Sequence, residues 1–184
     1  MWPWGHLAVA YLLYSAFTQT KDSHSPSGLA VFALALGSQF PDLIDKPLGW
    51  SLSVLPGGRT LAHSVFLAAI LIPLVYVFAS KYNQSESATA FSLGYIVHLL
   101  TDIPPSVLTG DVEELTFLFW PVLEQPEYEE VESILEGFLR YSMGSYEWAQ
   151  LALVALAIIV WYRDGWPGIA YAQLQLKRFT PLTK

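Results

Sequence analysis

Five apolar segments separated by clusters of Gly, Pro and Ser constrain the fold of this chain more than any other feature of its sequence. Each segment is longer than an ordinary strand and rich in Ala and Leu, so each is predicted to form a helix. The segments cover roughly residues 6–17, 28–40, 61–80, 88–100 and 148–162. The sequence therefore predicts an all-α fold, in a single domain that spans residues 1–184.

The composition points towards a membrane protein. Hydrophobic residues make up 53% of the chain and charged residues 14%, against a usual quarter. Trp and Tyr flank several apolar segments, as they do at membrane interfaces. Segment 61–80 alone clearly reaches the about 20 residues that cross a bilayer core. We expect a polytopic membrane helical bundle of about four to five apolar helices; the alternative is a soluble all-helical domain with short buried helices.

The charge and the cysteine content exclude several kinds of site. A net charge of -7 with nine Lys and Arg argues against nucleic acid as a partner, because phosphate binding needs a basic face. The chain has no Cys, so a metal ion must be held by His and carboxylate groups. The first six residues contain no Lys or Arg ahead of the first apolar segment, so we expect no cleaved signal peptide.

An acidic region interrupts the apolar pattern. Nine acidic residues and no Lys or Arg lie between residues 111 and 136. Since runs of charge usually face water, residues 111–144 are predicted to form an acidic loop or surface helix outside the bundle. A lid that covers a substrate is the alternative, because long loops often carry function.

Ionisable residues in apolar surroundings mark a candidate site. Such groups are costly in a low-dielectric medium, so they are normally neutralised, paired or bound to a metal. If the helices cross alternately, the start of the first, the end of the second, the start of the third and the end of the fourth lie on one side. The residues at those positions are His6, Asp42, Asp45, His63, His98 and Asp102.

The spacing of these residues suits metal binding. His98 and Asp102 are four residues apart, so on a helix they project from one face and can bind the same ion. Asp42 and Asp45 are three residues apart, and one helical turn or a tight turn brings them together. The preceding Pro41 is also typical of a simple helix stop.

Other residues have two interpretations each. His63 is expected to point into the bundle, whereas a lone His such as His6 is more often structural. Arg59 is suited to binding phosphate or carboxylate. Alternatively, Arg59 pairs with Asp42 or Asp45 as a structural lock. His24 lies in a polar stretch and is predicted to be at the surface.

These residues fall within a series of short motifs: Gly5-His6, Pro41-Asp42, His63-Ser64, Leu93-Gly94-Tyr95 with His98 and Asp102, and Trp120-Pro121. Their order and spacing resemble those of the predicted membrane-bound metal-dependent hydrolases of the YdjM type. Similar proteins usually read Pro-Asp-x-Asp-His where this chain has Asp45 one residue later and Lys46 near the His position. They also read His-Arg-Gly-x-Thr-His-Ser where this chain has residues 58–64, so two of their candidate ligands are missing.

The resemblance implies metal-assisted hydrolysis at a membrane. We expect one or two divalent ions, zinc foremost, bound by His6, Asp42, Asp45, His63, His98 and Asp102. Asp45 or Asp102 is then the expected general base, and Arg59 would stabilise developing negative charge. A likeness to helical zinc phospholipases suggests a phosphodiester or phospholipid-like substrate, so the expected partners are the lipid bilayer and a small-molecule or lipid substrate.

Two other functions remain open at this point. The chain could be a non-catalytic membrane protein stapled by a metal, or an ion- or proton-coupled transporter. Clustering at one end of the helices opposes the transporter, because transport sites lie near the midplane. Six Lys and Arg lie on the side away from the site and three on the site side, so the positive-inside rule predicts a multi-pass protein of the cell membrane with its site outside the cytoplasm.

Overall fold

The computed structural model describes residues 1–124 and 143–179, and every regular element within these ranges is helical. The all-α prediction is therefore confirmed. The five apolar segments each form a helix, and α7 is an additional helix that the sequence analysis did not predict. The elements are α1 Pro3–Asp22, α2 Gly28–Lys46, η1 Pro47–Ser51, α3 Val65–Ser80, α4 Ser85–Thr101, η2 Pro105–Thr109, η3 Val112–Phe119, α6 Ser145–Arg163 and α7 Ile169–Phe179.

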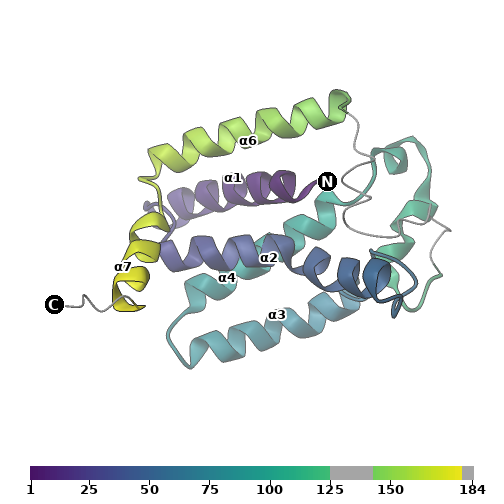
Figure 1. Cartoon of the computed structure of the whole chain (residues 1–184), viewed down its shortest axis with the longest axis horizontal. Coiled ribbons are helices and arrows are strands. Elements are labelled where there is room, and N and C mark those ends of the chain that lie inside the picture. Colours follow the sequence, from purple (N-terminus) through teal and green to yellow (C-terminus); the bar gives the residue numbers. More distant parts are fainter. Residues whose placement is uncertain (125–142, 180–184) are drawn as a thin grey trace.

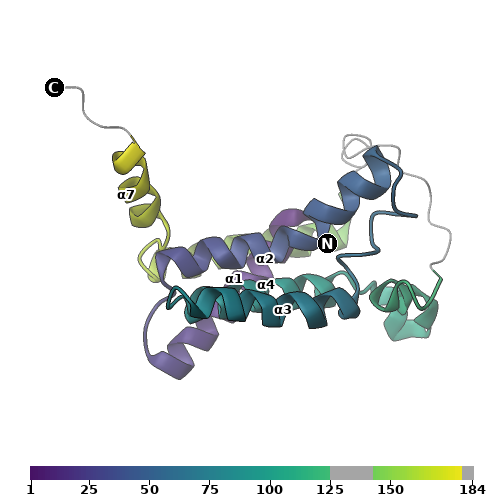
Figure 2. The same ribbon diagram turned by 90° about the horizontal axis from the view of Figure 1, so that it is seen from below.

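The helices form a bundle in which α1, α2, α3 and α4 run in alternating directions (Figure 1). Helix α2 packs most extensively on α4, while α1 contacts α2, α4 and α6, and α3 packs on α4. The starts of α1, α3 and α6 therefore lie at the same end as the ends of α2 and α4 (Figure 1). Helix α7 lies at the opposite end (Figures 1 and 2).

The lengths of the apolar helices differ from the expectation. Among the described residues, α6, with 19 residues, is long and apolar enough to cross a membrane, whereas α3 is apolar but has 16. Segment 61–80 was predicted to be long enough to cross a bilayer core. This prediction is wrong, because the first four residues of the segment lie in the loop before α3. Ser64 ends this loop as the N-cap of α3, and its side chain accepts a hydrogen bond from the backbone N–H of Phe66.

Helices α2 and α4 touch backbone to backbone through two glycines. A Cβ atom on Gly94 would lie 2.5 Å from the carbonyl oxygen of Leu34, and one on Gly37 would collide with the carbonyl oxygen of Phe91. Hydrogen is therefore the side chain that fits at both positions. This contact brings the carbonyl of Ser38 on α2 within reach of the side chains of α4.

Helix α2 continues through Pro41 to Lys46, so Asp42 and Asp45 lie one helical turn apart and the proline does not stop the helix. Because Pro41 has no N–H, the carbonyl of Gly37 lacks its usual partner within the helix, which allows a bend. Figure 2 shows the last part of α2 and η1 tilting away from the line of the bundle. Both aspartates are buried.

The predicted acidic excursion, residues 111–144, lies largely outside the described residues. Its described first part contains η3, which lies at the same end of the bundle as the starts of α1 and α3 (Figure 1). The side chain of Phe117 in η3 is fully buried, so this part of the region packs on the bundle and is not a fully solvated loop.

The glycine contact between α2 and α4 gives a direct prediction. Replacing Gly94 by Ala places a methyl group against backbone that cannot rotate away, so the free energy of unfolding is expected to fall by about 1–3 kcal/mol. Thermal unfolding of the purified protein measures this, with Ser87→Ala on the same helix as the control. A rise in stability, as expected for replacing an exposed helical glycine, would contradict the backbone contact.

Candidate metal site

Four side chains from three parts of the chain converge at the end of the bundle where α2 and α4 end. Asp42 comes from α2, His63 from the loop before α3, His98 from α4 and Asp102 from the cap of α4. All four are buried, and each offers one ligand atom within 4.8 Å of the other three. The structure thus brings together four of the six predicted metal ligands.

The distances between these atoms match a metal centre. From Nε2 of His63, the distances are 3.1 Å to Nε2 of His98, 3.4 Å to Oδ2 of Asp102 and 3.6 Å to Oδ1 of Asp42. From Nε2 of His98, the two carboxylate oxygens lie at 3.7 and 3.8 Å. Four ligands placed tetrahedrally about 2.0–2.1 Å from a zinc ion lie about 3.3–3.4 Å apart. Small side-chain adjustments therefore suffice to close the site on a single ion.

The opposite ring nitrogens fix the orientation of the two imidazoles. Nδ1 of His98 lies 2.7 Å from the carbonyl oxygen of Ser38, which can accept but not donate. Nδ1 of His63 lies 2.8 Å from Oδ2 of Asp45. Both Nδ1 atoms therefore donate, and in neutral imidazoles both Nε2 atoms carry lone pairs that face the centre. Such partners are typical of metal-binding histidines.

The carboxylates add further acceptors to the same point. Oδ1 of Asp42 is buried and has no hydrogen-bond partner within the part of the chain that the structure describes. Oδ2 of Asp102 also faces the two imidazoles. Because a buried acceptor without a donor is costly, Oδ1 of Asp42 beside Oδ2 of Asp102 indicates a place for positive charge.

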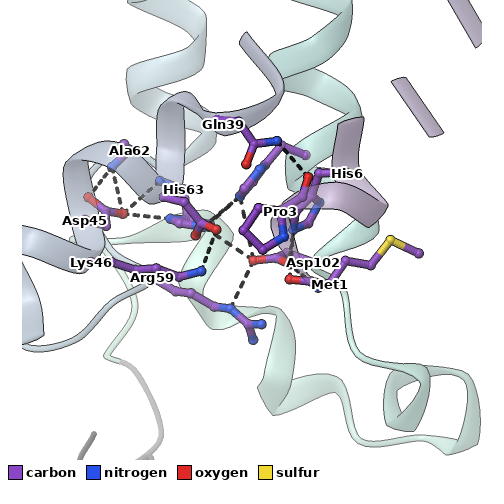
Figure 3. A network of polar contacts seen from close by, with 12 residues as sticks. Met1, Pro3, His6, Gln39, Asp45, Lys46, Arg59, Ala62, His63 and Asp102 are labelled. Carbon is purple, nitrogen blue, oxygen red and sulfur yellow. Dashed lines mark hydrogen bonds and ion pairs between the residues drawn. The ribbon is translucent and has the colours of Figure 1, made fainter. Parts of the chain in front are cut away.

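Asp45 lies behind His63 rather than at the centre. It is fully buried, and its two oxygens accept hydrogen bonds from the backbone N–H groups of Thr60, Ala62 and His63 as well as from the His63 ring. Figure 3 shows Asp45 on one side of His63 and Asp102 on the other. Asp45 therefore organises the loop before α3 and orients the imidazole of His63.

His6 also lies next to the four residues without joining them. Its ring stacks on that of His98, with centroids 3.9 Å apart. Its Nε2 lies 3.1 Å from Oδ1 of Asp102, the oxygen that faces away from the two imidazoles, and its Nδ1 lies 2.7 Å from Oγ1 of Thr101. His6 therefore holds Asp102 and His98 in position.

Two basic side chains bind the carboxylates from one side (Figure 3). Lys46 forms an ion pair with Oδ2 of Asp42, and Nε of Arg59 lies 3.1 Å from Oδ2 of Asp102. The pairing of Arg59 with a carboxylate was one of the two interpretations, although its partner here is neither Asp42 nor Asp45. The side chains of Lys46 and Arg59 are 22% and 33% exposed, so this side of the site reaches the surface.

The surroundings also shift the ionisation of His63, in the loop before α3, and of Asp102, at the cap of α4. Burial would lower the pKa of His63, but hydrogen bonds to Asp102, Asp42 and Asp45 outweigh it and raise the pKa to about 9. Burial would raise the pKa of Asp102, but Arg59 and the neighbouring imidazoles hold it well below its usual value. The surroundings thus favour the positively charged form of His63 and keep Asp102 ionised.

A comparison with protein families agrees with the resemblance found in the sequence motifs. The family model described as YdjM inner membrane protein matches residues 1–168 of the chain. The chain belongs to the YdjM family of inner membrane proteins. No curated protein and no solved structure gives a significant match. The family places the chain at a lipid bilayer, and the geometry supplies a buried group of side chains that could hold a metal ion.

Some contacts at the site were not anticipated from the sequence. Lys46 follows Asp42 by four residues, and this helical spacing was a signal for the ion pair. The carbonyl of Ser38 carries no such signal, because a backbone group has no residue-type signature. The α-amino group of Met1, 2.6 Å from Oδ1 of Asp102, likewise depends on the path of the chain.

Metal analysis tests the centre directly. Protein purified without chelator is expected to contain about one divalent ion per chain, since four protein ligands bind tightly. The double variant with His98→Ala and Asp102→Ala should lose it, and the surface variant His24→Ala should retain it. Elemental mass spectrometry measures the content; equal metal in the double variant and the control would refute binding at this site.

The role of Asp45 is testable separately. In Asp45→Asn the partner of the His63 ring is weakened, while Asp42, His63, His98 and Asp102 all remain. The metal dissociation constant is expected to rise by about 10–100-fold, as for other residues that orient a metal ligand. A competition titration with a chromophoric chelator gives the affinity, and an unchanged dissociation constant in a folded variant would exclude the positioning role.

Proposed function

We propose that this protein is a membrane-bound metal-dependent hydrolase that acts on a phosphodiester or phospholipid-like substrate. The observation that carries the proposal is the convergence of four buried acceptor atoms, from Asp42, His63, His98 and Asp102, with the basic groups of Lys46 and Arg59 on the exposed side. No nucleophilic cysteine is available, so a metal-assisted reaction is the chemistry that these residues suit best.

A single zinc ion is the metal we propose for the centre. Two imidazole nitrogens and two carboxylate oxygens suit zinc, manganese or iron, and the near-tetrahedral spacing favours zinc. A second ion would need further ligands, but both oxygens of Asp45 already accept N–H groups. Once bound, a divalent ion polarises a phosphoryl oxygen and makes a water molecule more acidic.

The charge of the site favours an anionic substrate. Asp42, Asp45 and Asp102 carry three negative charges, and a divalent cation with Lys46 and Arg59 carries more positive charge than these. The excess positive charge lies on the exposed side of the site, because Lys46 and Arg59 reach the surface there. A phosphodiester brings negative charge that this surplus can bind.

The residues of the site then have different roles in the proposed hydrolysis. We assign Arg59 to binding the phosphate and stabilising the negative charge that develops on it. Of the two expected general bases, only Asp102 has an oxygen facing the centre, so we assign proton transfer to Asp102, which would accept the proton when that oxygen is not bound to the ion. Asp45 is a positioning residue for His63, because its oxygens are saturated by N–H groups.

The second candidate function is structural: the metal ion would only hold the helix ends together. The observation in its favour is that Asp42, His63, His98 and Asp102 would supply four protein ligands to an ion, as in structural zinc sites, whereas catalytic zinc keeps an open position. Hydrolysis by this chain requires the ion to accept a fifth ligand or an acidic residue to move aside. Activity measurements on the metal-loaded protein separate the two functions.

We further propose that the protein is multi-pass, with its site outside the cytoplasm. Lys21, Lys81 and Arg163 lie at or near the end of the bundle away from the site, as does Lys177 of α7. On the site side, Lys46 and Arg59 are engaged by the aspartates. The positive-inside rule then assigns the end that carries α7 to the cytoplasm. The position of the site at one end of the bundle does not favour a transporter.

The hydrolase proposal predicts the effect of removing Arg59. In Arg59→Ala, hydrolysis of bis(p-nitrophenyl) phosphate and of phospholipid substrates should fall about 10²–10³-fold in kcat, the usual loss for one stabilising group. The metal content should stay the same, and Lys21→Ala, at the far end of the bundle, should retain full activity. If metal-loaded wild-type protein hydrolyses none of these substrates, the result would instead support a purely structural role for the metal ion.

A further inference from the structure

An apolar groove lies between α3 and α4 and has a volume of about 450 Å³, within the range of ligand sites. Small side chains create it, because Ala68 and Ala69 leave space where the neighbouring turns of α3 carry larger residues. No charged or hydrogen-bonding side chain lines the groove. The lining residues are Val65, Ala68, Ala69, Ile72, Pro73, Ile96, Leu99, Leu100 and Leu118.

One end of the groove lies at the end of the bundle that carries the candidate metal site. Leu99 follows His98 directly, and Val65 follows His63 by two residues. Leu118 follows Phe117, whose ring packs edge-on against that of His63 with centroids 6.2 Å apart. From there the groove extends to Pro73, two turns along α3 and away from the site.

The groove opens on an exposed apolar face. Leu100 is 60% exposed, and Ile96 is also exposed. Beside the groove, Ile70 and Leu74 of α3 point outward and are exposed as well. In an inner membrane protein, such a face contacts lipid, so hydrocarbon chains have direct access to the groove.

We propose that this groove binds an acyl chain of a phospholipid whose phosphate lies at the metal site. The groove follows the axes of α3 and α4, and a lipid chain lies along the same direction when these helices cross the bilayer. The headgroup of that lipid then lies at the end of the bundle, where Lys46 and Arg59 supply positive charge. This inference rests on the proposed hydrolase function and narrows its substrate to a membrane phospholipid.

Photochemical labelling tests the groove without depending on hydrolysis. The protein is placed in bilayers of phosphatidylethanolamine and phosphatidylglycerol that contain a phospholipid with a diazirine in its acyl chain. Peptide mass spectrometry then maps the labelled residues. In the wild type, labelling is expected to concentrate on residues 65–73 and 96–100. Ala69→Trp should fill the groove and abolish this labelling, whereas Ile70→Trp, one residue away but outside the groove, should preserve it.

The same variants separate the groove from the chemistry. Ala69→Trp should lose hydrolysis of long-chain phospholipids while keeping its metal and its hydrolysis of bis(p-nitrophenyl) phosphate. Labelling spread evenly over the exposed faces of α3 and α6, or unchanged in Ala69→Trp, overturns the groove proposal. Cross-links from the groove to a second protein chain overturn it also, because a protein then occupies the space. If labelling concentrates in the groove but neither substrate is hydrolysed, the groove stands and the hydrolase function fails.

Discussion

The packing of the helix ends depends on four side chains that are buried around one point and could hold a metal ion. Asp42, His63, His98 and Asp102 come from three separate parts of the chain and can meet only if the helix ends do. Each is held from behind by a further group, such as the Ser38 carbonyl for His98 and Asp45 for His63. The negative charge that Asp42 and Asp102 bring into this buried space is costly unless positive charge lies beside it.

The backbone contact between α2 and α4 makes this convergence possible. With hydrogen as the side chain at Gly37 and Gly94, the two helices approach closely enough for His98 to reach the carbonyl of Ser38. One turn later α2 presents Asp42 to the centre and Asp45 to the loop before α3. That loop in turn delivers His63 and Arg59. The packing of α2 against α4 therefore determines the geometry of the candidate metal site at their ends.

The length and composition of the five apolar segments were enough to predict a helix in each, and the alternation of these helices predicted that the candidate residues gather at one end of the bundle, whereas α7 was not predicted. The four-residue spacing of His98 and Asp102 likewise predicted that both face one ion. The sequence could not separate ligands from supporting residues, because Asp42 and Asp45 have the same side chain and differ only in the neighbours that the fold provides. His6 is similar: its stacking on His98 depends on how α1 meets α4. The shortened α3 depends on the hydrogen bonds of Asp45 to the preceding loop.

X-ray absorption spectroscopy of the zinc-loaded protein tests the central claim most directly, because it reports the atoms bound to the ion. The expected first shell consists of two imidazole nitrogens and two carboxylate oxygens at about 2.0–2.2 Å. The imidazole scattering should diminish in His63→Ala and stay unchanged in His6→Ala, whose ring lies outside the four. A first shell of water oxygens without imidazole, or one that depends on His6 and not on His63, would contradict the account.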